Sequence, residues 1–141
     1  MANTQALPTS MKVDALTAVA PNGDTIKAAL YLTTASIGAG TAAYTATGEV
    51  SGAGYSAGGV TVTHATAATS SGTTAYWTPS ASIAYTSVTL ATAFDCVLLY
   101  NSSQSNRAIS VNTFGSQTIT AGTFTLTMPT NDASNALVRL G

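Results

Sequence analysis

The C-terminal half of the chain alternates apolar and hydroxyl-bearing side chains with a period of two. In the segment 122–128, Phe124, Leu126 and Met128 are separated by threonines. Because successive side chains of a β-strand point to opposite faces, this pattern predicts a strand with one apolar face and one polar face. The segment 107–114 shows a similar alternation. This half of the chain is therefore predicted to be β structure.

Several other segments also predict strands. The segment 94–100 is almost continuously apolar, which predicts a central strand covered on both faces. Alternation and flanking turn residues predict the remaining strands, at 25–33, 59–65, 74–78, 83–92 and 136–140. About seven or eight short strands separated by turn signals are typical of an antiparallel β-sandwich or small barrel. The fold class is therefore predicted to be mainly β.

A short helix is predicted near the N-terminus. Thr9 or Ser10 can cap its first turn, and the spacing of Met11, Ala15 and Leu16 places these three residues along one face.

The length of 141 residues fits one β-rich domain, which we expect to span 1–141. Within it, the N-terminal helix or arm is expected over 1–20. Clusters of Gly, Ser and Thr predict long loops at 34–59 and 65–75. A long loop inside a compact domain is usually functional or flexible.

Charged residues make up only 6% of the chain, whereas a soluble domain typically has about 25%. Four Lys and Arg in total cannot form the basic stripe that neutralises phosphates, so we expect no nucleic-acid partner. The longest strongly apolar run, 97–100, is far shorter than the roughly 20 residues of a membrane span, so we expect no membrane partner. Threonine keeps strand surfaces polar without charge and has a high β-propensity.

The residue types that usually carry catalysis are isolated in this sequence. His64 is the only histidine, and Cys96 is the only cysteine and lies inside an apolar strand. The acidic residues are scattered singly, without a pair that suggests a metal site. We therefore expect no catalytic, cofactor-binding or metal-binding residues and no enzymatic activity. Asp95, beside Cys96, is expected to pair with Arg107 across a predicted hairpin.

Three aromatic residues, Tyr55, Tyr76 and Trp77, are the candidate interface residues. Tyrosine and tryptophan are enriched in interface hot spots, and Tyr55 lies in a glycine-rich loop. The alternative is that Trp77 and one tyrosine pack in the core. Tyr76 and Trp77 are neighbours in a predicted strand, so they should point to opposite faces.

Three stretches of the sequence, 25–59, 98–115 and 123–140, contain distinctive strings, above all AYTATGEVSGAGYSAGG at 43–59 and YNSSQSNRA at 100–108. In these stretches the chain resembles a family of small proteins encoded in the structural gene modules of tailed bacteriophages. These strings carry no known chemistry. The resemblance implies a virion component without catalytic residues.

The leading hypothesis is a capsid decoration (cement) protein that bridges neighbouring major capsid subunits on the outer surface of the head. Its expected partners are the major capsid protein and copies of itself, as a dimer or trimer. Its expected location is the virion, assembled in the cytoplasm of the bacterial host. One alternative is a tail, neck or fibre-associated subunit. Another is a carbohydrate-binding β-sandwich with Trp77 and a tyrosine as an exposed aromatic platform.

Overall fold

The protein is mainly β, with two antiparallel sheets and one short N-terminal helix, an arrangement consistent with a small β-sandwich. The computed structural model describes residues 3–64 and 67–141. In chain order the elements are α1 (Thr9–Val19), β1 (Ile26–Leu32), β2 (Val60–Thr61), β3 (Thr69–Ser71), β4 (Thr74–Trp77), β5 (Ile83–Asn101), β6 (Arg107–Leu126) and β7 (Val138–Leu140).

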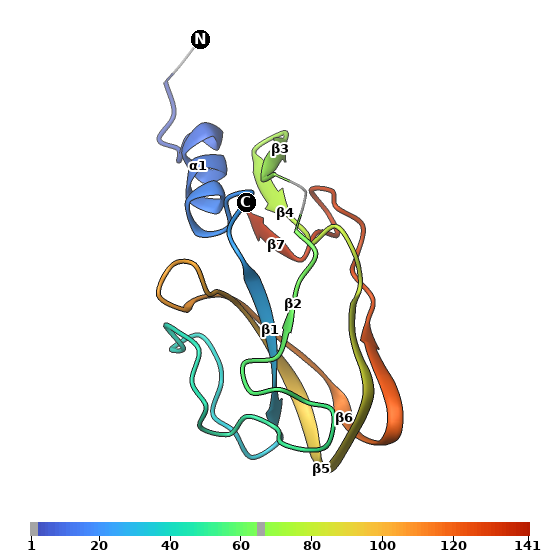
Figure 1. Cartoon of the computed structure of the whole chain (residues 1–141). Helices are drawn as coiled ribbons and strands as arrows, with labels where there is room; N and C mark the ends of the chain where they lie inside the picture. Colours follow the sequence, from blue (N-terminus) through green and yellow to red (C-terminus); the bar gives the residue numbers. More distant parts are fainter. Residues whose placement is uncertain (1–2, 65–66) are drawn as a thin grey trace.

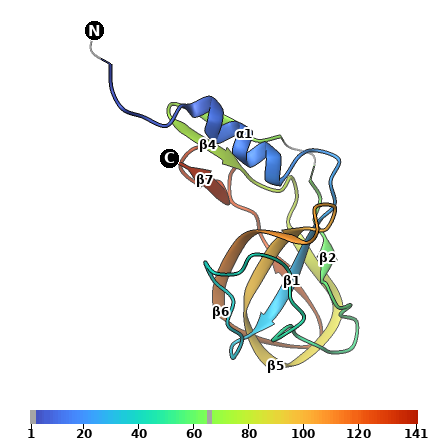
Figure 2. The same ribbon diagram turned by 90° about the vertical axis from the view of Figure 1, so that its left-hand side faces the viewer.

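The two sheets lie at opposite ends of the molecule. The larger sheet has the strand order β2-β1-β5-β6, and the smaller has the order β3-β4-β7. Helix α1 lies across the smaller sheet, at the end of the molecule where the chain also terminates (Figures 1 and 2). One continuous cluster of buried side chains joins the two ends, since it includes Leu16 of α1, Trp77 of β4 and Leu30 of β1.

Strands β5 and β6 form one long hairpin that folds back over itself. Phe124 lies in the part of β6 that pairs with Tyr85, nine residues along β5 from Phe94. In a flat hairpin this separation would be roughly 30 Å, at about 3.3 Å per residue. The rings of Phe94 and Phe124 are instead 5.1 Å apart, edge to face. The fold-over thus places the two halves of the hairpin against each other as two layers.

Backbone irregularities permit this bend. The register of β5 with β6 shifts at five points, and Ser87 and Ala121 have positive φ angles of 53° and 46°. These two residues adjoin the Val88↔Gly122 pair. Bulges and left-handed residues of this kind increase local twist and bend a strand.

Most predicted strands are present, although their boundaries differ. The predicted strands 83–92 and 94–100 are one continuous strand, β5, and the residues from Cys96 to Asn101 are buried as expected for a central strand. The predicted strands 107–114 and 122–128 belong likewise to the single strand β6. Of the strand expected at 59–65, the described residues 59–64 contain only the two residues of β2, and residue 65 lies outside the described residues.

The two loop predictions have different outcomes. The 34–59 segment holds only isolated bridges, as expected of a loop. Within 65–75, where a loop was predicted, the structure has β3 and the start of β4, which pair as a hairpin. Residues 65–66 of that prediction lie outside the described residues.

The helix prediction is correct in position and partly wrong in detail. Leu16 is buried as expected, but Met11 is 44% exposed and Lys12 is buried in its place. The Nζ atom of Lys12 reaches the smaller sheet and donates to the carbonyl oxygen of Thr73 at 2.9 Å. The capping prediction is also wrong, because the residue before the helix is Pro8 and no side chain caps the first turn.

The other end of α1 is held by the turn between β5 and β6. Side-chain amides of Asn101 and Gln104 donate to the carbonyl oxygens of Val19 and Ala18, each at 3.0 Å. Both amides also donate to Oδ2 of Asp24, each at 2.8 Å. These bonds satisfy carbonyl groups that a helix leaves unpaired at its C-terminus. The segment 100–108 therefore holds the C-terminal end of α1 against the large sheet.

Candidate functional site: an apolar groove beside the N-terminal helix

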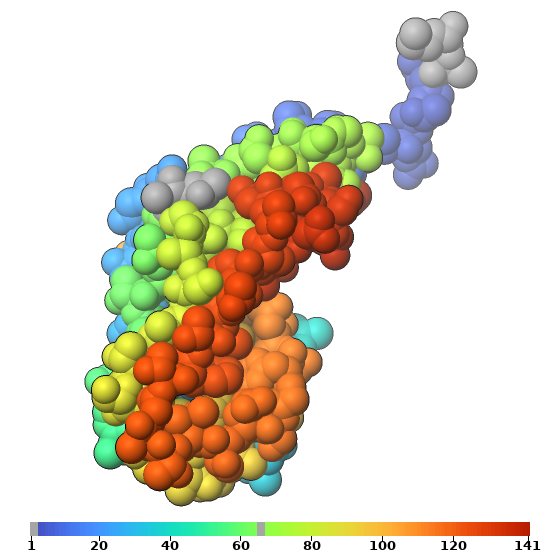
Figure 3. Space-filling view, turned by 90° about the vertical axis from the view of Figure 1, so that its right-hand side faces the viewer, coloured from blue at the N-terminus to red at the C-terminus, as the bar shows by residue number. Residues whose placement is uncertain are grey.

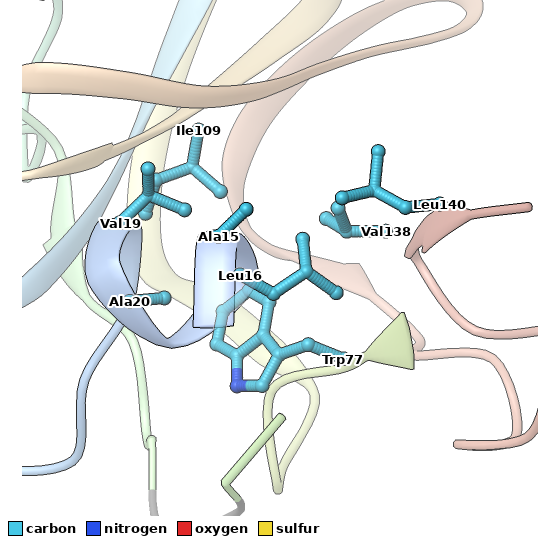
Figure 4. Close-up of a pocket in the computed structure, with 8 residues that line it drawn as sticks. All are labelled: Ala15, Leu16, Val19, Ala20, Trp77, Ile109, Val138 and Leu140. Atoms are coloured by element: carbon cyan, nitrogen blue, oxygen red, sulfur yellow. The ribbon is translucent and has the colours of Figure 1, made fainter. Parts of the chain in front are cut away.

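An open groove of about 250 Å³ lies between α1 and the smaller sheet. We call it the apolar groove. Four elements supply its lining, which consists of Ala15, Leu16, Val19 and Ala20, Trp77, Ile109, Val138 and Leu140. Figure 4 shows these side chains converging from α1, β4, β6 and β7 around a common space. None of the eight carries a charge, so the groove is suited to bind apolar side chains.

Exposed apolar side chains gather around the same end of the molecule. The exposed large hydrophobic residues of the described chain are Leu7 at 54%, Met11 at 44% and Leu140 at 38%. Leu7 precedes α1, Met11 lies in its first turn, and Leu140 forms part of the groove lining. Single exposed apolar residues are ordinary, and here the three are carried by α1, the segment before it and β7.

The glycine-rich loop at 48–59 is held in place by the carboxylate of Glu49. Its Oε1 accepts hydrogen bonds from the hydroxyl of Tyr55 and the backbone N–H of Gly58, both at 2.7 Å. Its Oε2 accepts from the hydroxyl of Tyr44 at 2.6 Å. Bonds from donors to an ionised carboxylate are among the stronger hydrogen bonds of proteins. We call these four residues the Glu49 cluster.

Close backbone approaches fix the same loop against both layers. The N–H of Val50 donates to the carbonyl of Leu30 in β1, and the N–H of Thr89 in β5 donates to the carbonyl of Ala53. Gly59 has a φ of 79°, and a Cβ there would lie 1.7 Å from the carbonyl oxygen of Ala28. The loop therefore closes the gap between β1 and the first half of β5, and its glycines serve this packing.

The tyrosines around this loop stay protonated over an unusually wide pH range. Burial raises the pKa of Tyr31 to about 12. Burial, reinforced by the nearby Glu49 carboxylate, raises the pKa of Tyr44 and Tyr55 further. Their hydroxyls therefore act as hydrogen-bond donors, and the Glu49 cluster works as an internal crosslink of the fold.

The three candidate interface residues occupy different environments. Trp77 is 1% exposed and forms one wall of the apolar groove. Tyr76 points to the other face of β4 and is half-buried, as strand alternation predicts. Tyr55 is half-buried and accepts a hydrogen bond from the N–H of Leu30 at 3.0 Å in addition to its bond to Glu49. Trp77 is thus too buried to form an exposed aromatic platform, and an interface role for the three residues stays a prediction.

The only histidine, His64, and the only cysteine, Cys96, both lie in packed surroundings. Nε2 of His64 lies 3.0 Å from the carbonyl oxygen of Pro21, and its ring meets that of Trp77 edge to face. Cys96 is 5% exposed, and burial raises the pKa of its thiol, which disfavours the reactive thiolate.

The predicted pair of Asp95 with Arg107 is wrong. Arg107 is the partner of Asn101 in the hairpin register, six residues along β5 from Asp95. At about 3.3 Å per residue this separation is roughly 20 Å. The prediction failed because it placed the two residues opposite each other across a turn that lies further along β5.

Two further properties concern the described residues only. Residues 3–64 and 67–141 contain no group of three or more His, Cys, Asp or Glu side chains placed to hold a metal ion. In the same part of the chain, no helix has both the length and the apolar character that crossing a membrane requires.

Sequence reasoning did not find the groove. Its lining comes from positions between 15 and 140 in the sequence, and no local pattern links them. Comparison with known proteins gives no significant match to a protein-family model, a curated protein sequence or a solved structure.

Proposed function

We propose that this protein is a structural subunit of a bacteriophage virion, acting as a decoration (cement) protein that bridges neighbouring major capsid subunits on the outer surface of the head. The observation that carries the proposal is the apolar groove, which includes the exposed side chain of Leu140 and borders α1, the helix that follows the exposed Leu7 and contains the exposed Met11. An exposed apolar surface of this kind is typical of a protein–protein contact.

The strings behind the resemblance to phage virion proteins have structural roles in this chain. The segment 43–59 contains the Glu49 cluster, and the segment 100–108 holds the end of α1. The resemblance therefore rests on residues that build the fold.

The low charge of the chain defines the kind of contact that we expect. With 6% charged residues, binding to the particle relies on apolar burial and uncharged hydrogen bonds. Salt screens only interactions between charges, so attachment should depend weakly on ionic strength. Release of the protein from particles at modest ionic strength would contradict this expectation.

Copy number and position on the particle test the proposal. A cement protein is expected in hundreds of copies on the head, whereas a tail ring has about six or twelve copies, set by its cyclic symmetry. Electron microscopy of particles, with quantitative protein analysis, distinguishes these cases. Density restricted to the tail or neck would replace the cement role by that of a tail-associated subunit, and absence from particles would refute the virion proposal.

A groove variant tests which surface is used. Leu140→Asp places a charge at the mouth of the groove at a position that is already 38% exposed, so the fold should tolerate it. We expect this variant to rebind poorly to particles that lack the protein. Thr123→Asp is the matched control, because Thr123 is an exposed residue of β6 outside the groove. Equal rebinding of both variants would show that the groove does not contact the particle.

A further inference from the structure

The N-terminal arm, residues 3–8, is extended and exposed along its whole length. Residues 3–7 make no hydrogen bond with any other described residue. Figures 1 and 3 show the arm leaving the body of the molecule. It carries no charged residue, and its one large apolar side chain, Leu7, is 54% exposed. The arm is therefore an unpaired strand-like segment that carries an apolar anchor.

A second cavity, the edge slot, runs along the start of β6 and has a volume of about 360 Å³. Its lining consists of Gly38, Ala39 and Thr41 on one side and Ala108, Ile109, Ser110 and Val111 on the other. Strand β6 is the last strand of its sheet. Unpaired backbone groups at such an edge can pair with an additional extended segment. Residues 38, 39 and 41 form the outer wall of the slot.

From Ala108 onward, the outer edge of β6 carries none of the charged or proline side chains that often protect edge strands. The N–H of Ala108 donates to the carbonyl of Ala42, but beyond this point no described residue bonds to that edge. Natural edges are kept short or carry Lys or Pro. No charged residue or proline occurs from Ala108 to Met128. The other edge strands, β2, β3 and β7, have only two or three residues. The edge of β6 is thus the longest strand edge in the described chain.

Ile109 connects the edge slot with the apolar groove, because it lines both cavities. Side chains on the same face of two paired strands are neighbours. A segment paired with the edge of β6 can therefore direct a side chain alongside Ile109 into the groove. A cavity of about 150 Å³ holds a benzene molecule, so the 250 Å³ groove has room for a leucine side chain.

We propose that the edge slot and the apolar groove receive the N-terminal arm of a second copy of this chain, with Leu7 of that copy seated in the groove. Reciprocal exchange of arms then forms a dimer with two-fold symmetry. The inference takes from the proposed function only that the groove is an assembly site. Arm, slot and groove are all uncharged, so no charge is buried without a partner.

The size of this contact matches a modest dimer. Eight residues line the groove and seven line the slot, with Ile109 in both. Together with its own arm, each copy contributes about 20 residues, at the lower limit of the roughly 20–30 per side found in stable interfaces. We expect a dimer that dissociates on dilution and is strengthened when many copies are held on one surface.

Sedimentation of the full chain over a range of concentrations tests the exchange. Leu7→Ser and Leu140→Asp are each expected to raise the dissociation constant of the dimer roughly 10- to 100-fold, the effect of losing one buried leucine. Both positions are exposed, so folding is preserved. Thr123→Asp is the control, because Thr123 is exposed and lies outside the arm, the slot and the groove.

Disulfide crosslinking identifies the contact directly. Mixing a Leu7→Cys chain with a Leu140→Cys chain under oxidising conditions should give a crosslinked heterodimer. Cys96 does not interfere because it is buried. A double Leu7→Cys and Leu140→Cys chain should crosslink between copies.

Each contrary outcome overturns the inference. A chain that stays monomeric, a dimer unaffected by Leu7→Ser, or an equal effect of Thr123→Asp would exclude arm exchange. A monomeric intramolecular disulfide in the double variant would show that the arm binds its own groove. The proposed function is judged separately, by the copy number and position of the unmodified protein on the particle, because these measurements do not depend on what occupies the groove.

Discussion

The Glu49 cluster predicts a large loss of stability when its carboxylate is removed. In a Glu49→Ala variant, the hydroxyls of Tyr44 and Tyr55 and the N–H of Gly58 all lose their acceptor. Gly58 is buried, and Tyr44 and Tyr55 are both half-buried. At least two donors are then left without a partner and with limited access to water.

The magnitude follows from these unpaired donors. Leaving a buried donor unsatisfied costs about 1–3 kcal/mol, so two such donors predict a loss of roughly 2–6 kcal/mol in the free energy of unfolding. This is a large part of the 5–15 kcal/mol typical of a domain. Glu49→Gln keeps one carbonyl acceptor, and its amide can donate to the Tyr44 hydroxyl, so we expect a loss of only about 1–2 kcal/mol.

Urea unfolding monitored by tryptophan fluorescence measures these changes. Trp77 is the only tryptophan and is buried, so its emission reports on unfolding. Asp14→Ala is the matched control, because Asp14 is an exposed carboxylate of α1. We expect the control to change the free energy by less than about 0.5 kcal/mol. A loss below about 1 kcal/mol for Glu49→Ala, with an unchanged denaturant slope, would refute the role of the cluster.

Three further predictions use the same unfolding assay. Gly59→Ala should lower the free energy of unfolding by roughly 3 kcal/mol or more, because the added Cβ would meet the Ala28 carbonyl. Its control, Gly40→Ala, should lower the same free energy by less than about 0.5 kcal/mol, because a Cβ there would lie in open space. Five of the six tyrosines have a raised pKa, that of Tyr31 being about 12. Their contribution to the free energy of unfolding is therefore fully present below the ordinary tyrosine pKa of 10.0 and is lost as pH rises through the folded-state values. We expect this loss of stability to accompany the appearance of tyrosinate absorbance. Hydrogen bonds from two side-chain amides lower the pKa of Asp24. Its contribution to stability is therefore present above the ordinary value of 3.8 and is lost as pH falls through the folded-state value. We expect the free energy of unfolding of Asp24→Asn to fall less steeply with decreasing pH than that of the unmodified protein.

The alternation of side chains located the strands because it reports directly on which face is buried. It placed 107–114 and 122–128 correctly in β structure but did not join them. The residues between them depart from regular pairing, and Ala121 adopts a positive φ at the bend. A two-residue period is lost wherever a bulge adds a residue to one strand. The fold-over of the hairpin was therefore not readable from the pattern.

The sites were less predictable than the strands. Glu49 was one of several scattered acids in the sequence, and its two tyrosine partners lie five residues before it and six residues after it, a spacing that indicates no regular element. The apolar groove depends on bringing α1 and β7 together from opposite ends of the chain. Met11 was assigned to the inner face of α1, but Lys12 takes that place because the Thr73 carbonyl satisfies its ammonium group.

The bent hairpin also sets an order for folding. The β5–β6 hairpin can grow outward from its turn, beginning with the Asn101↔Arg107 pair, so that each added pair closes only a short loop. The smaller sheet requires Trp77 to meet Val138, about 60 residues away, which closes a much longer loop. We therefore expect the hairpin to form early and the smaller sheet late. Partly folded chains would then lack a complete apolar groove, which would restrict assembly to chains that have finished folding.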